Sequence, residues 1–156
     1  HVIYRLATDE HPQKETFKNY IREGLESVQQ MFGNHAEEVG QFIYLIKKAI
    51  LLSDISTDDV RAIEDELGGG WVAEETAAIA NYCALSYFEN FEKAMIAAVN
   101  HTGDSDSTGA VTGNLLGAAI GYDAIPQFYK NDLELHDVIL HIADDLYLGE
   151  TTPYRK

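Results

Sequence analysis

The sequence predicts an all-α fold, and two observations lead to it. Apolar residues recur at three-to-four spacing along most of the chain, which is the period of an amphipathic helix. No alternation of apolar and polar residues is long enough for a useful strand. With 156 residues, 46% of them hydrophobic, the chain can enclose one core, so we expect residues 1–156 to belong to a single domain.

Three helices are predicted in the first part of the chain. The first two are marked by apolar residues at helical spacing: Phe17, Ile21, Leu25 and Val28, then Val39, Phe42, Ile43, Ile46 and Ile50. Gly33 or Asn34 is expected to take the left-handed conformation that ends the first helix. A third, shorter helix should follow Ser56 and run toward Leu67, because Ser56-Thr57-Asp58-Asp59 offers a capping oxygen and acidic residues.

A glycine-rich loop and four helical segments follow. Gly68-Gly69-Gly70-Trp71 interrupts regular structure, since consecutive glycines weaken any helix. Core helices are predicted over 73–88 and 91–99, with Asn90 as the cap of the second. A helix running to Tyr122 should follow the polar segment 100–108. The last helix should cover about 133–148, with four residues inward: Val138, Ile139, Ile142 and Leu146.

Four glycines share one face of the helix that precedes Tyr122. Gly109, Gly113, Gly117 and Gly121 stand at four-residue intervals. Glycine costs about 1 kcal/mol relative to alanine inside a helix. We therefore expect another helix or a bound ligand to approach this face closely, and helix packing alone is the simpler explanation.

Charge and cysteine usage narrow the classes of function. The 26 acidic and 11 basic side chains give a formal charge of -15, which repels nucleic-acid backbones and anionic membranes. The single cysteine, Cys83, excludes an internal disulfide and lies in an apolar run. No membrane span or secretion signal is found in the sequence, so we expect a cytoplasmic protein.

The segment His101-Thr102-Gly103-Asp104-Ser105-Asp106-Ser107-Thr108 concentrates oxygen donors just before the glycine-lined helix. Mg²⁺ and Ca²⁺ prefer such ligands. At a junction between a loop and a helix, Asp104, Asp106 and the Ser107 hydroxyl can converge on one point. Spacing alone leaves a second interpretation open, in which these residues are redundant helix N-caps.

Two other motifs fail on the same residues. A calcium-binding EF-hand loop starting at Asp104 would need a bidentate glutamate where Leu115 stands. A phosphotransferase signature also matches Asp104, Asp106 and Thr108. That chemistry needs the nucleophilic aspartate at the end of a buried strand, and the surroundings here are helical.

Four motifs in order carry a resemblance to a known family. They are the segments 67–76 (LGGGWVAEET), 98–108 (AVNHTGDSDST), 113–118 (GNLLGA) and 124–126 (AIP). Together they resemble the C-terminal half of the ADP-ribosylglycohydrolase family, which includes the dinitrogenase-reductase-activating glycohydrolases. The pattern extends over about 24–148 and is strongest from Leu67 onward.

The resemblance implies a compact orthogonal helical bundle with a two-Mg²⁺ centre in a cleft that takes ADP-ribose, Mn²⁺ being an alternative ion. The family's metal ligands map onto Asp104, Asp106 and Ser107, with Asp106 as the bridge between the ions. Gly69, Gly70 and Trp71 match the glycine-rich segment near the substrate, where backbone N–H groups can approach phosphate or ribose. Trp71 could stack on the substrate or only pack.

The resemblance also implies an N-terminal half that this sequence does not contain. The family's remaining metal ligands and its acidic proton-transfer residue lie there, so the catalytic residues are not assigned. Asp58 and Asp59 are interpreted as helix caps. We expect this chain to be a fragment that binds metal weakly and hydrolyses nothing alone, because Mg²⁺ needs further fixed ligands.

The histidines are not predicted to bind metal. His101, His136 and His141 have no cysteine or histidine partner at zinc-like spacing, so surface or capping roles are expected. His101 alone lies close to the acidic segment in the sequence.

Three functions compete at this point. The first is Mg²⁺-dependent hydrolysis of the glycosidic bond between ADP-ribose and a protein side chain or small acceptor. The second is a non-catalytic ADP-ribose-binding or structural, crystallin-like member of the family. The third, a helical interaction module, does not explain the acidic segment combined with the glycine-lined helix.

Overall fold

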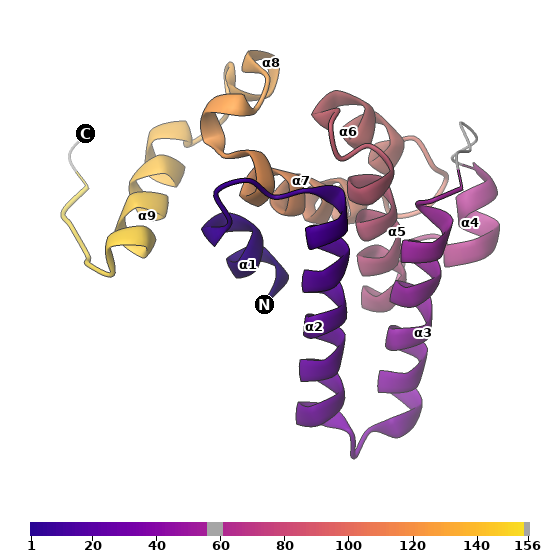
Figure 1. Ribbon diagram of the computed structural model, residues 1–156. Coiled ribbons are helices and arrows are strands. Elements are labelled where there is room, and N and C mark those ends of the chain that lie inside the picture. Colours follow the sequence, from indigo (N-terminus) through magenta and orange to yellow (C-terminus); the bar gives the residue numbers. More distant parts are fainter. Residues whose placement is uncertain (56–60, 155–156) are drawn as a thin grey trace. The chain divides into compact units, whose positions relative to one another are not determined.

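The computed structural model describes residues 1–55 and 61–154, and they are helical with no β-strand among them. They divide into two compact units, 1–124 and 125–156. The N-terminal unit contains α1 (Val2–Thr8), α2 (Lys14–Phe32), α3 (Ala36–Leu52), α4 (Arg61–Leu67), α5 (Ala73–Ser86), α6 (Phe91–Val99), α7 (Ser105–Ile120) and the 3₁₀ turn Tyr122–Ala124 (Figure 1). The predicted all-α class is confirmed.

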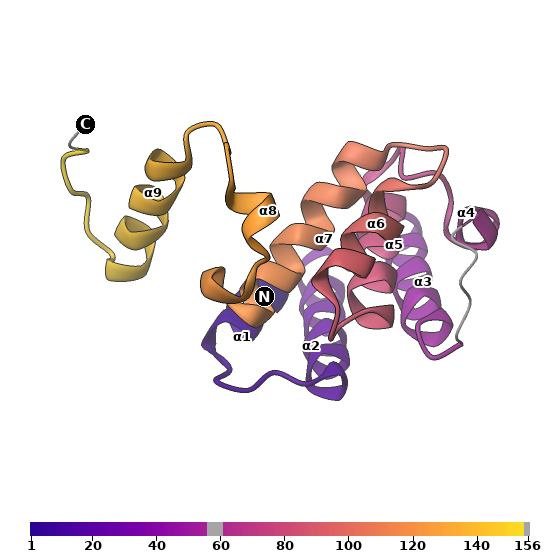
Figure 2. The ribbon, with the colours of Figure 1, turned by 90° about the horizontal axis from the view of Figure 1, so that it is seen from above.

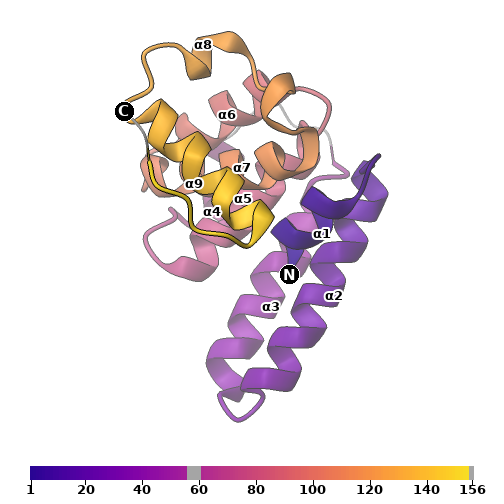
Figure 3. The ribbon, with the colours of Figure 1, turned by 90° about the vertical axis from the view of Figure 1, so that its left-hand side faces the viewer.

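Helices α2 and α3 form an antiparallel hairpin and lie side by side along their length (Figure 3). The hydroxyl oxygen of Thr16 accepts a hydrogen bond from the backbone N–H of Gln13, which fixes the start of α2 (2.8 Å). The expected left-handed residue at the hairpin is wrong. Gly33 has φ -62° and ψ -15°, which is right-handed, and Asn34 does not have a positive φ either.

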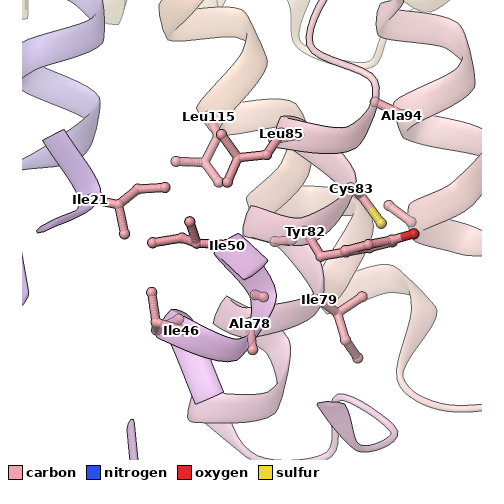
Figure 4. Packing of buried hydrophobic residues seen from close by; sticks show 14 of the residues in the cluster. Ile21, Ile46, Ile50, Ala78, Ile79, Tyr82, Cys83, Leu85, Ala94 and Leu115 are labelled. Atoms are coloured by element: carbon pink, nitrogen blue, oxygen red, sulfur yellow. The ribbon is translucent and has the colours of Figure 1, made fainter. Parts of the chain in front are cut away.

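Helix α5 is the centre of the core (Figure 4). Every residue from Ala78 to Leu85 is buried, so this part of the helix is enclosed on all sides. Small side chains such as Ala80 and Ala84 allow α3, α6 and α7 to approach closely. Ile50 of α3 and Leu115 of α7 are among the side chains packed in the same cluster.

Helices α6 and α7 pack against each other beside α5 (Figure 2). The predicted cap of α6 is confirmed, because the Asn90 side chain accepts a hydrogen bond from the backbone N–H of Lys93 (3.0 Å). Helix α7 begins at Ser105, inside the polar segment that the sequence placed before it. The sequence does not mark this start clearly, because polar residues are common both in loops and in the first turn of a helix.

The glycines of α7 have different surroundings. A Cβ atom on Gly109 would lie 2.8 Å from a methyl group of Val99, so an alanine there would force Val99 or α6 to shift. A Cβ on Gly113 would lie 3.8 Å from Met95, an ordinary contact. Gly121 has φ +76° and ends the helix. Close helix packing therefore explains Gly109 and does not explain Gly113.

Helices α1 and α4 complete the N-terminal unit. Helix α1, which the sequence did not predict, packs against α2 and α7 through the buried Leu6. Helix α4 buries Ile63 and Leu67 against its neighbours and leads into the glycine-rich loop. The expected cap over 56–59 lies outside the described residues. None of the described helices is long and apolar enough to cross a membrane.

The C-terminal unit contains α8 (Gln127–Lys130) and α9 (His136–Leu148). The C-terminal unit does not by itself bury the face of α9 that was predicted to point inward. No α9 side chain is buried, Val138 is only half-buried, and Ile139, Ile142 and Leu146 are exposed. The spacing correctly indicates a helix, but two short helices present too little apolar surface to enclose a core.

Candidate functional site

The glycine-rich loop and the acidic turn meet in the folded N-terminal unit. We define the glycine-rich loop as residues 68–72 and the acidic turn as residues 101–107. The backbone N–H of Asp104 donates to the carbonyl oxygen of Gly69 (2.8 Å). A Cβ on Gly103 would collide with that same carbonyl group, so only glycine permits this approach. The two segments singled out in the sequence are therefore joined backbone to backbone.

The glycine-rich loop is held by the first turn of α5. Gly68 and Gly70 have φ values of +89° and +78°, a region that favours glycine. The Thr76 hydroxyl donates to the carbonyl oxygen of Gly70 (2.7 Å), and the Glu75 carboxylate accepts from the backbone N–H of Trp71 (3.2 Å). The loop is thus fixed from one side by two neighbouring side chains.

Trp71 lies on the surface of the glycine-rich loop. The residue is 73% exposed, so its indole does not pack in the core. The Cδ1 and Nε1 atoms of the indole lie 3.0 Å from the position that a Cβ atom on Gly69 would take. Most of the indole is therefore free to meet another group.

The acidic turn opens helix α7. Asp104 is the N-cap residue, yet its side chain makes no capping hydrogen bond. Asp106 is exposed and accepts a hydrogen bond from the adjacent N–H of Ser107 (2.9 Å). The backbone N–H of Ser107 nevertheless contributes to the lowered pKa of the Asp104 carboxyl, so helix capping stays open beside the metal-ligand prediction.

The three predicted metal ligands are neighbours in space. A hydrogen bond with the Asp106 carboxyl is the largest cause that lowers the pKa of Asp104 below its ordinary value. A hydrogen bond from the Ser107 hydroxyl is the next. Asp104 is therefore ionised near neutral pH and offers a hard oxygen donor beside two more. Among the described residues, no group of three or more His, Cys, Asp and Glu side chains could hold a metal ion. The donor set of this turn is two carboxylates and one hydroxyl.

From the sequence, a surface or capping role was expected for His101, and the structure contradicts it. Its side chain is 1% exposed. Its Nδ1 atom accepts from the backbone N–H of Gly103 (3.1 Å), and Nε2 lies 2.8 Å from the Thr108 hydroxyl. That hydroxyl donates to the carbonyl oxygen of Ala98 at the end of α6 (2.7 Å). His101 therefore links the acidic turn to the core.

Glu64 of α4 reaches the same turn, which the sequence did not predict. Its carboxylate accepts hydrogen bonds from both the backbone N–H and the hydroxyl of Thr102, the latter at 2.9 Å. It also lies 3.8 Å from Nδ1 of His101. No spacing rule relates Glu64 to Thr102 in the sequence, and only the fold brings them together.

The histidines of α9 have ordinary partners within their own unit. His136 lies 3.1 Å from the carboxylate of the adjacent Asp137. His141 contacts the carbonyl oxygen of Thr152 (3.0 Å) and lies 3.7 Å from Asp145. Both histidines therefore have partners inside the C-terminal unit, and their surface or capping roles stay predictions.

Comparison with known proteins gives a family match and distant relatives. The family model for ADP-ribosylglycohydrolase matches residues 2–156. An uncharacterized protein of Archaeoglobus fulgidus is 33% identical over 105 residues, which are 66% of this chain and 33% of that protein. Human ADP-ribosylhydrolase ARH3 is 26% identical over 112 residues, which are 65% of this chain and 31% of that protein. The matched part of the chain thus spans about one third of each relative. No solved structure matches.

Proposed function

We propose that this chain, which belongs to the ADP-ribosylglycohydrolase family, supplies part of the active site of an ADP-ribosyl hydrolase. The bond cleaved is the glycosidic bond between ADP-ribose and a protein side chain or a small acceptor. The observation that carries this proposal is the hydrogen bond between Asp104 and Gly69, which joins the acidic turn to the glycine-rich loop. A donor set for a metal and a surface for a nucleotide then lie next to each other.

The acidic turn is proposed to hold the metal. Asp104, Asp106 and Ser107 would be ligands of Mg²⁺, with Mn²⁺ as the alternative ion. The fit is supported by the oxygen chemistry of the three side chains and by the ionised state of Asp104. When bound, the metal would orient ribose hydroxyls and stabilise charge that develops as the glycosidic bond breaks.

The glycine-rich loop is proposed to contact the substrate through Gly69, Gly70 and Trp71. The exposed indole of Trp71 offers a flat apolar surface on which a base or sugar ring can stack. The N–H of Trp71 is already bound to Glu75, so this particular donor is not offered to phosphate. The stacking role is therefore better supported for Trp71 than a backbone role.

The proposed site is incomplete within these residues. Three donors on one turn leave most positions of an octahedral Mg²⁺ ion to water, and Mg²⁺ binds weakly under those conditions. We propose that the 156-residue chain alone binds Mg²⁺ weakly and hydrolyses no ADP-ribosyl bond. The remaining ligands and the proton-transfer residue would come from a further part of the same fold. Tight two-site binding of Mg²⁺ to the isolated chain in calorimetry would contradict this.

The test is a hydrolysis assay on the complete product of the gene that encodes this chain. Asp106→Asn is compared with Glu92→Gln, a change of equal charge at an exposed position of α6. With Mg²⁺, Asp106→Asn should lose about a hundredfold in rate, and Glu92→Gln should stay close to the parent. Hydrolysis that persists in EDTA would contradict the metal site. Binding of ADP-ribose without any hydrolysis would support the non-catalytic alternative.

A further inference from the structure

Three consecutive backbone N–H groups of the acidic turn each donate to a different acceptor. The N–H of Thr102 donates to Glu64 of α4, and that of Gly103 donates to Nδ1 of His101 (3.1 Å). The N–H of Asp104 donates to Gly69 in the glycine-rich loop (2.8 Å). The path of the backbone into the proposed ligand Asp104 is therefore held at three successive points.

The contacts of His101 define one form of its ring. A backbone N–H can only donate, so Nδ1 must carry a lone pair toward Gly103. A neutral imidazole then has its proton on Nε2, which faces the hydroxyl oxygen of Thr108 (2.8 Å). The Thr108 hydroxyl in turn donates a hydrogen bond to the carbonyl oxygen of Ala98 (2.7 Å). Every donor in this series has an acceptor, and the series ends on the core helix α6.

Glu64 holds the preceding residue with both carboxylate oxygens. One oxygen accepts the N–H of Thr102, and the second accepts its hydroxyl at 2.9 Å. The Glu64 side chain is 20% exposed, so these bonds are partly shielded from water. These two hydrogen bonds attach Thr102 to helix α4.

We propose that His101 and Glu64 are positioning residues for the acidic turn. They act on the carboxylates of Asp104 and Asp106 through the backbone of Thr102 and Gly103, without binding the metal themselves. This inference rests on the proposed function, because it assigns a purpose to the geometry of the proposed metal ligands. Partners that orient metal ligands commonly change metal affinity by 10- to 100-fold when they are removed.

The first test is free of metal and uses hydrogen exchange of the Thr102, Gly103 and Asp104 amides. In His101→Asn the side-chain oxygen takes the place of Nδ1, and in His101→Gln the side-chain NH₂ takes the place of Nε2. The Gly103 amide should exchange about tenfold faster in His101→Gln and remain close to the parent in His101→Asn. Glu64→Ala should likewise speed exchange of the Thr102 amide. Asp65→Ala, a change at an exposed neighbouring position, should leave that exchange rate unchanged.

The second test is a Mn²⁺ titration of the same variants, followed by electron paramagnetic resonance. His101→Gln and Glu64→Ala should weaken binding about tenfold, while His101→Asn and Asp65→Ala should change it little. Thermal unfolding of each variant shows that the fold is kept. Unchanged amide exchange in His101→Gln and Glu64→Ala would overturn the positioning role, and so would faster exchange with unchanged Mn²⁺ affinity.

Asp104→Asn separates failure of this inference from failure of the proposed function. If Asp104→Asn binds Mn²⁺ as the parent does, the proposed metal site is wrong. Loss of binding in Asp104→Asn together with unchanged binding in His101→Gln and Glu64→Ala would overturn the positioning role alone.

Discussion

The backbone N–H of Asp104 lies 2.8 Å from the carbonyl oxygen of Gly69, and this bond joins two loops that are distant in the sequence. Each loop starts a helix that packs against the other, α5 and α7. The relative position of the proposed metal ligands and the proposed substrate loop therefore depends on core packing, and it can be changed by substitutions that touch neither group.

Gly103→Ala should force the two loops apart. The new Cβ would fall on the carbonyl group of Gly69, a backbone group that cannot move without moving its loop. We expect a loss of about 1–3 kcal/mol in the free energy of unfolding, measured by urea denaturation. Gly103→Ala with the stability of the parent would show that the loops do not approach as described.

Gly113→Ala is the matched control on α7. Its Cβ would lie 3.8 Å from Met95, and the residue is inside a helix. Replacing this glycine should therefore stabilise the protein by about 0.5–1 kcal/mol, because alanine loses less backbone entropy on folding. A destabilised Gly113→Ala variant would indicate a closer neighbour on this face of α7 than Met95.

Thr108→Val should be destabilising although valine has the same shape as threonine. The buried hydroxyl accepts from His101 and donates to the carbonyl oxygen of Ala98, and valine leaves both groups without this partner. We expect a loss of about 1–3 kcal/mol. Thr112→Val is the control. Its hydroxyl donates only to the Thr108 carbonyl oxygen one turn earlier, so its loss should be below about 1 kcal/mol.

In the ion pairs at the start of α2, Lys18 is buried and its carboxylate partners are exposed, so removing either partner should have a different cost in stability. Lys18 is 3% exposed and lies 2.6 Å from Asp54 and 2.8 Å from Glu15, whose side chains are largely exposed. Asp54→Ala leaves a buried charge with one partner fewer and should cost about 1–2 kcal/mol. Lys18→Met leaves Asp54 paired with Lys14 (3.5 Å) and Glu15 open to water, so it should cost less. The reverse order in urea denaturation would contradict this.

The same pair predicts a dependence of stability on pH. The hydrogen bond from Lys18 lowers the pKa of Asp54 below its ordinary value of 3.8. Asp54 therefore contributes its full stability above that value, and the contribution is lost as the pH falls through the lowered pKa. The parent should lose more stability than Asp54→Ala between pH 5 and strongly acid solution. Parallel losses in the two proteins would exclude this contribution.

Cys83 should report global opening of the N-terminal unit. The thiol is buried in α5, and desolvation raises its pKa to about 12. Because the thiolate is the reactive form, a thiol reagent at pH 8 should label the native protein far more slowly than the urea-unfolded protein. Immediate labelling of the native protein would show that the core around α5 is open.

Much of the fold can be predicted because helical periodicity is local. The pattern of Phe17, Ile21 and Leu25 identifies α2 directly, since one face of the helix is buried. Helix α1 was missed because seven residues with a single buried side chain, Leu6, give no period to recognise. Helix α9 was recognised, but the pattern cannot indicate whether any surface covers Ile142.

The candidate site was predicted in part for the same reason. Motif order indicated the glycine-rich loop and the acidic turn, and the fold brings them together at Gly69 and Asp104. The contributions of Glu64 and His101 could not be predicted, because hydrogen bonds between distant segments leave no periodic signal. The metal-binding roles of Asp104 and Asp106 stay predictions.

The most direct measurement is an anomalous difference map from crystals of the complete gene product grown with Mn²⁺. The account predicts a peak at direct ligand distance from carboxylate oxygens of Asp104 and Asp106, with the Ser107 hydroxyl beside it. Carboxylates of Asp104 and Asp106 that face solvent, with Mn²⁺ peaks only elsewhere in the protein, would contradict it.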